Sequence, residues 1–109
     1  MSKHPVILKG ELWSLVRTRR GLAKTKEAPK GLWGYAWSET REIRVRPPTD
    51  FPNVEKEADI LIHEALHACL PDVDEAVVTQ TATEIARVLS IAGVLRSGEL
   101  EARPCKTSK

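Results

Sequence analysis

A long apolar helix is the feature that most constrains how this chain can fold. From Glu55 to Leu70 apolar residues recur at helical spacing, and further aliphatic residues fill most of the positions between them. Acidic side chains near its start suit the helix dipole, and Pro71 stops the helix at Leu70. A helix that is apolar nearly all round is normally buried, so the other elements must be arranged to cover it.

Two histidines and a glutamate interrupt this apolar surface. His63 and His67 are four residues apart, so both imidazoles project from one face of the helix toward the same point. Zn²⁺ readily accepts imidazole nitrogen, and Glu64 beside the metal could take a proton from a water. A solvated helix face could carry the same residues, but the apolar neighbours indicate burial, which is costly for such groups without partners. The spacing therefore predicts a water-activating zinc site.

A third protein ligand would have to come from another segment. Glu75 falls on the inner stripe of the next predicted helix, where that helix packs on the first. The other members of this stripe are Val78, Ala82, Ile85 and Leu89. Asp74 is expected to cap the helix, Glu84 lies off the stripe as a surface acid, and His4 belongs to an N-terminal arm. Glu75 is thus the favoured third ligand of a His₂Glu site, with Asp72 and Asp74 as alternatives.

The first predicted element is a short amphipathic helix over residues 11–19. Its apolar stripe, at helical spacing, consists of Leu8, Leu12, Leu15 and Val16. Residues 20–31 combine lysines with glycines and a proline and offer little to bury, so we expect a mobile basic loop there.

A β-hairpin is predicted between this loop and the helix that carries His63 and His67. Its strands cover residues 32–37 and 42–46, and Ile43 and Val45 should point inward because they alternate with charged residues. Aromatic residues alternate along the first strand and could form a hydrophobic wall or a substrate platform. They are Trp33, Tyr35 and Trp37. We expect the tryptophans, Trp13 included, to pack in or on the core.

The last predicted helix begins after its cap, Asp74, and ends near Gly93, and residues 97–109 are expected to form a flexible tail. The chain is therefore expected to be a single α+β domain over residues 1–109, with its core within about residues 5–93. Its composition, 41% hydrophobic and 29% charged, is typical of globular proteins and argues against a disordered or fibrous chain.

Location and partners can be predicted only coarsely. No apolar run is long enough for a signal sequence or a membrane span, so we expect a cytoplasmic protein with free thiols at Cys69 and Cys105. Residues 1–50 carry 11 Lys and Arg against 5 Asp and Glu, whereas residues 51–109 carry 6 against 10. The basic half could contact nucleic acid or an acidic protein, but mutual neutralisation of the two halves is the favoured explanation.

A family resemblance adds to this interpretation. Residues 59–68, Asp-Ile-Leu-Ile-His-Glu-Ala-Leu-His-Ala, followed by Asp74-Glu75 and a helix, resemble the minimal gluzincin metallopeptidases. That group includes phage-encoded peptidases, SprT-like proteins and the anti-repressor metallopeptidases of mobile elements. The resemblance covers about residues 31–90, and its specific part is the motif from His63 to His67. It implies a zincin-like fold and one Zn²⁺ per chain, held by His63, His67 and Glu75, with Glu64 as general base.

The same resemblance implies a zinc-dependent metallopeptidase that hydrolyses peptide bonds. In those families an extended peptide pairs with an edge strand near the metal helix. Here that strand would be residues 42–46, with Arg44 and Arg46 flanking the substrate and Tyr35 available to stabilise the oxyanion. The arginines could instead protect a strand edge, and Tyr35 could simply pack on the core.

Two further hypotheses compete with the peptidase. One is a non-catalytic zinc-containing module that binds nucleic acid or a protein partner through the basic N-terminal half. The other is a DNA-associated protease similar to the SprT-like group, which would combine both properties.

Overall fold

The structure, a computed structural model, describes residues 2–22 and 31–95. The elements follow in the order β1 (Ser2–Leu8), β2 (Glu11–Arg17), β3 (Gly34–Trp37), β4 (Glu42–Val45), a 3-10 helix (Pro48–Asp50), α1 (Val54–Cys69) and α2 (Glu75–Ala92). The predicted tail, with Cys105, and most of the predicted basic loop lie outside the described residues.

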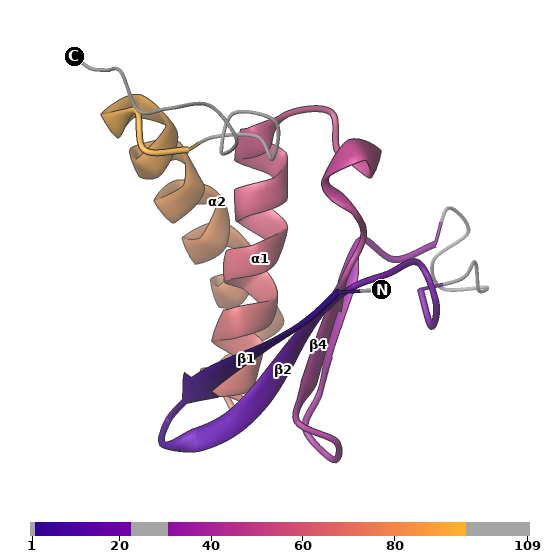
Figure 1. The fold of residues 1–109 in the computed structure, drawn as a ribbon. Helices are drawn as coiled ribbons and strands as arrows, with labels where there is room; N and C mark the ends of the chain where they lie inside the picture. Colours follow the sequence, from indigo (N-terminus) through magenta and orange to yellow (C-terminus); the bar gives the residue numbers. More distant parts are fainter. Residues whose placement is uncertain (1, 23–30, 96–109) are drawn as a thin grey trace.

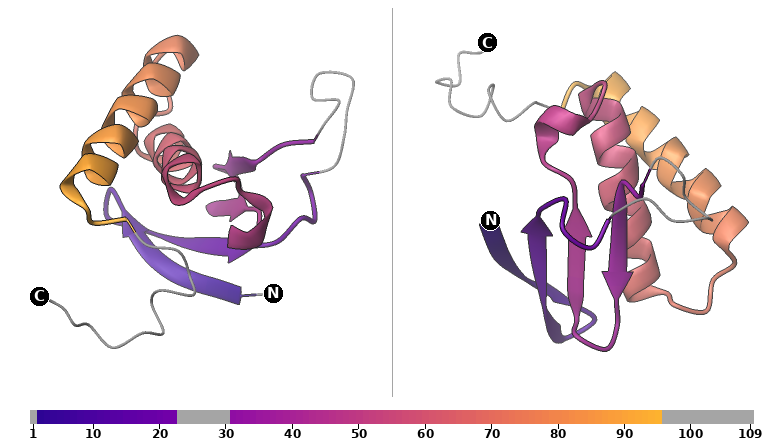
Figure 2. Two further views of the ribbon diagram at one scale, coloured as in Figure 1. Left: turned by 90° about the horizontal axis from the view of Figure 1, so that it is seen from above. Right: turned by 90° about the vertical axis from the view of Figure 1, so that its right-hand side faces the viewer.

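The domain is built in three layers, which confirms the α+β class (Figure 1). One face of the sheet packs against α1, chiefly through β3 and β4, and α2 packs on the opposite side of α1 (Figure 2). The buried cluster between the sheet and α1 consists of Trp13, Ile43, Val45 and Phe51. As predicted, α1 is the central helix, and a C-terminal helix covers it.

The sheet is mixed, with strand order β1-β2-β4-β3. The predicted hairpin is confirmed as β3 and β4, and Ile43 and Val45 are both buried. The expectation that residues 42–46 form an edge strand is wrong, because β2 pairs in parallel with the other side of β4. The free edge beside α1 belongs to β3 instead. This pairing joins residues far apart in the chain, so local pattern could not reveal it.

The predicted helix over residues 11–19 is wrong, because this segment is the strand β2 and pairs antiparallel with β1. The two strands are joined by Lys9 and Gly10, whose φ angles of 52° and 78° are both positive. A two-residue turn of this kind matches the twist of a hairpin and requires positive φ at both positions. Trp13, which the helical stripe left out, is buried in the core cluster, on which residues of α1 also pack. His4 lies in β1 and is exposed.

The ends of the predicted basic loop are anchored. The side chain of Leu22 is almost completely buried, with 1% of its surface exposed. The backbone N–H of Leu22 donates to Arg19 O at 3.1 Å, and that of Leu32 donates to Leu22 O at 3.1 Å. The expectation that residues 20–31 have little to bury does not hold for Leu22, and residues 23–30 lie outside the described residues.

Both helices begin and end close to the predicted residues. Asn53 caps α1 by accepting a hydrogen bond from Lys56 N, and Asp74 caps α2 by accepting one from Ala76 N, as predicted. At the end of α2, Gly93 has a φ of 78°, the left-handed conformation that glycine adopts readily. Val78, Ala82 and Ala86 are buried, as expected for the apolar face of α2, but the assignment of Ile85 to this face is wrong, since it is 39% exposed. Neither helix is both long and apolar enough to cross a membrane.

Candidate metal centre

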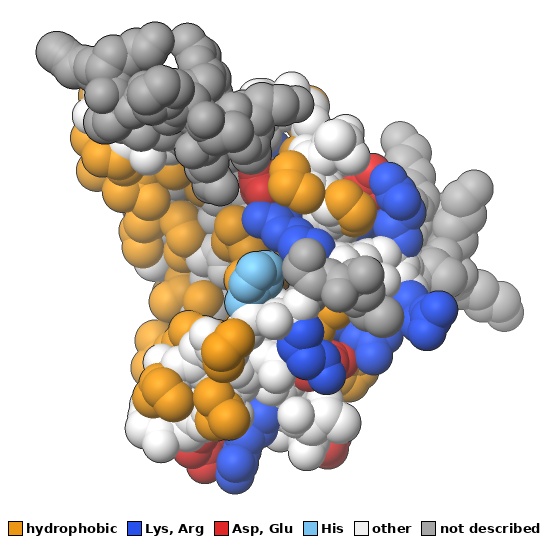
Figure 3. All heavy atoms as spheres, viewed as in Figure 1, with side chains coloured by type: hydrophobic (Ala, Val, Ile, Leu, Met, Phe, Trp, Pro, Cys, Tyr) orange, Lys and Arg blue, Asp and Glu red, His pale blue; other side chains and the backbone are white. Residues whose placement is uncertain are grey.

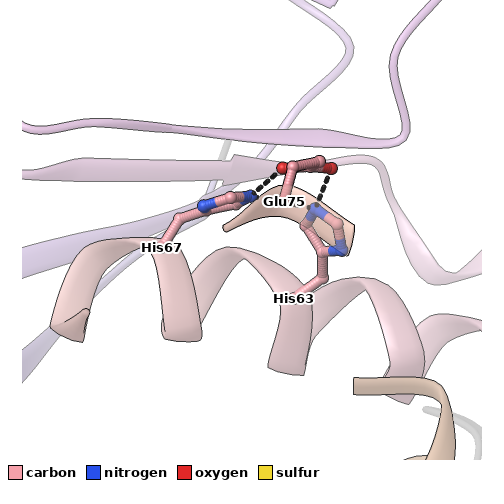
Figure 4. Close-up of side chains that lie close together, drawn as sticks. All are labelled: His63, His67 and Glu75. Atoms are coloured by element: carbon pink, nitrogen blue, oxygen red, sulfur yellow. Dashed lines mark hydrogen bonds and ion pairs between the residues drawn. The ribbon is translucent and has the colours of Figure 1, made fainter. Parts of the chain in front are cut away.

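His63, His67 and Glu75 converge where the N-terminus of α2 meets the C-terminal half of α1 (Figure 4). The two histidines are one helical turn apart on α1, and Glu75 is the first residue of α2. One carboxylate oxygen of Glu75 lies 3.2 Å from His63 Nε2, and the other lies 2.8 Å from His67 Nε2. The two Nε2 atoms are 3.1 Å apart. The three side chains thus direct their donor atoms at one point.

This geometry fits a tetrahedral metal ion. Ligand atoms bonded to zinc at about 2.0–2.2 Å in a tetrahedron lie roughly 3.3 Å from one another. The 3.1 Å between the two Nε2 atoms is close to one edge of such a tetrahedron, and each Nε2 lies within 3.2 Å of one oxygen of the Glu75 carboxylate. Two imidazoles and one carboxylate are also the donor set of open zinc sites, in which a fourth position stays available to solvent or substrate.

The structure places the alternative ligands elsewhere. Asp74 directs its carboxylate at Ala76 N, 3.1 Å away, because it caps its own helix. Asp72 is exposed and is not part of the cluster, and Glu84 accepts a hydrogen bond from Gln80 on the outside of α2. The exposed His4 lies on β1, outside the cluster. Of the third-ligand candidates predicted from sequence, all of which lie within the described residues 2–22 and 31–95, only Glu75 lies beside the two histidines.

Contacts between the helices fix the position of Glu75. Thr83 of α2 donates its hydroxyl to the carboxylate of Asp59 on α1 at 2.9 Å, and this bond joins the helices near the cluster. Asp59 lies one turn before His63 on the same face. Thr79 Oγ1 donates to the carboxylate of Glu75 at 3.4 Å. Neither threonine was singled out from the sequence, because a threonine one turn from a ligand carries no distinctive local signal.

Glu64 lies in the wall between α1 and the sheet. Its side chain is buried, with 7% of the residue exposed, and it makes no hydrogen bond or ion pair with any residue that the structure describes. Burial and, to a smaller extent, the nearby charge of Glu75 raise the pKa of the Glu64 carboxyl to about 7. A carboxyl with a pKa near neutrality can both accept and release a proton at physiological pH.

His63 is held in the state that can bind a metal. Burial lowers the pKa of its imidazole, and the field of His67 acts in the same direction, against the opposing effect of Glu75. The ring is therefore neutral at neutral pH and has a free nitrogen lone pair to offer. Its contact with Glu75 is accordingly a polar contact, not a full ion pair.

A cleft opens over the cluster. It has a volume of about 410 Å³ and lies between α1 and β3, and its walls include His63, Glu64, His67, Glu75 and Tyr35. A second hollow of about 340 Å³ adjoins it at His67 and extends toward the β1–β2 turn. The cluster thus lies in the wall of an open groove that runs along the edge strand β3.

Of the predicted substrate contacts, only Tyr35 lines this cleft. Arg44 lies 2.7 Å from Glu42 Oε1 and donates to Arg20 O at 3.0 Å. Arg46 donates to the backbone oxygen of Leu32 at 2.7 Å. Arg44 lies in the central strand β4 and Arg46 directly follows it, and both contact neighbouring loops. Neither is among the described residues that line the cleft. The edge-protection alternative also fails, since β4 has no free edge.

The predicted aromatic wall is only partly formed. The rings of Tyr35 and Trp37 lie 4.7 Å apart, in agreement with the predicted alternation. Trp33 instead stacks on Phe51 at 4.9 Å and packs against the buried cluster. Trp13 is buried, as predicted, and it also forms part of the cleft wall.

Gly34 is a cleft residue that the sequence analysis missed. A Cβ atom added at this position would lie 3.2 Å from Glu64 Cγ, 3.2 Å from Ile60 Cγ2 and 3.0 Å from Arg44 O. These distances are shorter than ordinary van der Waals contacts, so the absence of a side chain lets β3 pass close to Glu64. A glycine inside a predicted strand was the available signal, because it often marks a close approach of two segments.

Substitution of Gly34 by valine should therefore separate β3 from α1. We expect Gly34→Val to lower the free energy of unfolding by about 1–3 kcal/mol, the usual cost of overpacking. Urea unfolding of the metal-free protein measures this, and Thr40→Val, in the exposed β3–β4 turn, is the matched control with an expected change under about 0.5 kcal/mol. Equal stability of the two variants would contradict the close approach of β3 to Glu64.

Comparison with models of protein families, with curated proteins and with solved structures finds no match to this chain.

Proposed function

We propose that the chain is a zinc-dependent metallopeptidase with a zincin-like arrangement of sheet and helices. In this proposal His63, His67 and Glu75 hold the metal, and Glu64 is the general base. The observation that carries it is the convergence of three donor atoms from two helices, within 4.8 Å of one another, beside a buried carboxyl group in an open cleft. A purely structural site would have no need of Glu64 or of the cleft.

The proposed chemistry divides the work between the metal and Glu64. Zinc in such a site lowers the pKa of a water molecule and polarises the carbonyl group of the substrate. Glu64 accepts the proton of the attacking water and then delivers it to the amide nitrogen that leaves. The raised pKa of Glu64 supports this role, because the carboxyl group must be able to hold the proton between the two steps.

The substrate in this proposal is an extended peptide. The free edge of β3 borders the cleft, and an edge strand offers unpaired N–H and C=O groups to which an extended chain can add. This strand takes the place of β4, which the sequence analysis had assigned to substrate binding. Tyr35, the one tyrosine of the chain, lines the same cleft and is the candidate donor to the oxyanion.

Charge pairing argues against the nucleic-acid alternatives. Arg17 binds Glu57 at 2.6 Å, Arg19 binds Asp50 at 2.6 Å, and Arg41 lies 3.2 Å from a carboxylate oxygen of Glu11. Basic and acidic side chains are also interspersed over the sheet in Figure 3. Much of the described basic surplus is therefore neutralised within the domain, which supports the peptidase over a module that binds phosphates.

Zinc-dependent cleavage of an unfolded protein tests this function. We expect the protein with one equivalent of zinc to release new amino termini from reduced, alkylated casein, because such a chain can adopt the extended form that β3 would bind. Treatment with a chelator should abolish the release, and added zinc should restore it. Zinc uptake without cleavage of any unfolded substrate would favour the non-catalytic module.

A further inference from the structure

The second hollow beside the candidate metal centre continues the cleft beyond the end of β3. It adds Lys9 and Glu11, which flank the β1–β2 turn, to a wall that is otherwise shared with the cleft. The shared residues are Trp13, Ser38, His67, Ala68 and Pro71. The β1–β2, β3–β4 and α1–α2 turns lie together at this end of the domain (Figure 1). A peptide along β3 would therefore pass the centre and enter this hollow.

The second hollow has room for a short length of peptide. A compact space of its volume, about 340 Å³, is about 9 Å across, roughly the length of three residues in an extended chain. This volume lies within the range of ligand pockets. Because His67 lines both spaces, the hollow begins at a proposed zinc ligand. Its occupant would thus lie within about three residues of the bond that is cut.

Lys9 has an unusual backbone conformation. Its φ is 52°, in a two-residue hairpin turn where asparagine, aspartate and glycine are the favoured residues. Within the described part of the chain, the only other residue with a side chain and a positive φ is Arg41, at 53°. Side chains that are kept in unfavourable backbone conformations concentrate at functional sites. A lysine in this turn therefore points to a use for its side chain.

The charge of Lys9 is open to a ligand. Lys9 is exposed, and it makes no ion pair or side-chain hydrogen bond with any residue that the structure describes. The other charged residue that Lys9 adds a neighbour to in this wall is Glu11, whose carboxylate lies 3.2 Å from Arg41 Nη2. Arg41 thus offsets the negative charge of Glu11. Together the three side chains leave one net positive charge at the rim of the hollow.

We propose that the second hollow binds a carboxylate of the substrate through the ammonium group of Lys9. This inference rests on the proposed peptidase function, because it takes the occupant of the cleft to be an extended peptide. The carboxylate belongs either to an Asp or Glu side chain or to the free C-terminus of the peptide. Trp13 forms part of the same wall and offers an apolar surface to the carbon atoms beside that carboxylate.

The turn permits changes of charge that suit its backbone. Lys9→Asn removes the positive charge and Lys9→Asp reverses it, and both new side chains are favoured in this kind of turn. The matched control is Lys3→Glu, which changes the net charge as much as Lys9→Asp. Lys3 is exposed in β1 and is not among the described residues that line either space. Circular dichroism should report an unchanged fold in all three variants.

Peptide binding, measured by fluorescence anisotropy, tests the proposal separately from catalysis. The protein is the zinc-loaded Glu64→Gln variant, which is expected to keep zinc without cutting. Short acetylated, amidated peptides differ only in Glu, Gln or Lys at one position, which is moved along the chain, and a second set has a free C-terminus. We expect one position at which Glu binds about fivefold more tightly than Gln, the scale of an exposed charge pair.

The Lys9 variants, made in the same background, identify the group that binds. The preference for Glu should disappear in Lys9→Asn, change to a preference for Lys in Lys9→Asp and persist in Lys3→Glu. Tighter binding in the amidated set assigns the carboxylate to a side chain. A preference that requires the free C-terminus, and that Lys9→Asn removes, assigns it to the end of the peptide.

Three results would overturn the proposal. They are equal affinity for all peptides of both sets, a failure to bind any peptide, and a preference for Glu that persists in Lys9→Asp. Cleavage of casein by the wild-type chain alongside any of these would leave the peptidase function in place. A preference that depends on Lys9, without cleavage of casein, would keep the carboxylate-binding hollow and remove the peptidase function.

Discussion

Glu64→Gln is expected to lower kcat/KM for peptide cleavage by about 10²–10⁴-fold, because the amide cannot accept the proton of the attacking water. The substitution keeps the size of the side chain, which matters at a site with 7% of the residue exposed. Zinc content should stay at one ion per chain, since Glu64 is not among the three proposed ligands. The matched control is Glu84→Gln on the outside of α2, which should keep full activity.

The pH dependence of stability, measured in the presence of a chelator, provides a second test of Glu64→Gln. The pKa of Glu64 in the folded protein, about 7, lies above the ordinary value of 4.5, so the folded state holds an extra proton between these limits. Glu64 therefore lowers the free energy of unfolding of the metal-free protein as the pH rises from about 4.5 to about 7. Glu64→Gln should remove this decline. A variant that keeps both wild-type activity and the wild-type pH slope would exclude Glu64 as a buried general base.

Glu75→Ala is expected to weaken zinc binding by at least about 100-fold and to abolish cleavage, because it removes one of three protein ligands. Substitutions of the two neighbouring acids test whether one of them is the third ligand instead. Asp74→Ala should cost about 1 kcal/mol of stability through loss of the helix cap but should retain zinc. Asp72→Ala should change neither property, since its side chain is exposed and lies outside the cluster.

Competition with a chromogenic zinc chelator gives the affinity of all three variants on one scale. Circular dichroism of the metal-free proteins controls for folding. If Asp72→Ala lost zinc and Glu75→Ala kept it, the assignment of the third ligand to α2 would be wrong. Loss of zinc in all three variants at once would point to a general effect on the turn between the helices.

The part of the site that could be predicted from sequence lies on the two helices. The phase of a helix is fixed by local geometry, so the histidine spacing and the inner position of Glu75 both follow from residue numbers. Packing of α2 on α1, expected from their apolar stripes, was enough to bring these residues together. The caps at Asp74 and Gly93 were likewise visible in the local sequence.

The largest errors lie in the sheet, where contacts between distant segments decide the structure. Leu12, Leu15 and Val16 are compatible with a helical stripe, but the Lys9-Gly10 turn pairs this segment with β1 instead. The parallel pairing of β2 with β4 has no local signature, and it moved the free edge to β3. As a result the edge strand was predicted at β4 instead of β3. Tyr35 lines the cleft, whereas Arg44 and Arg46 are not among the described residues that line it.

X-ray absorption at the zinc edge, on protein loaded with one equivalent of zinc, tests the central claim most directly. The proposed centre predicts a first shell of only nitrogen and oxygen at about 2.0–2.2 Å, with the multiple-scattering pattern of two imidazoles. Sulfur at about 2.3 Å would mean that a thiolate such as Cys69 is a ligand. That result, or a failure to bind zinc at all, would contradict the account of an open site formed by His63, His67 and Glu75.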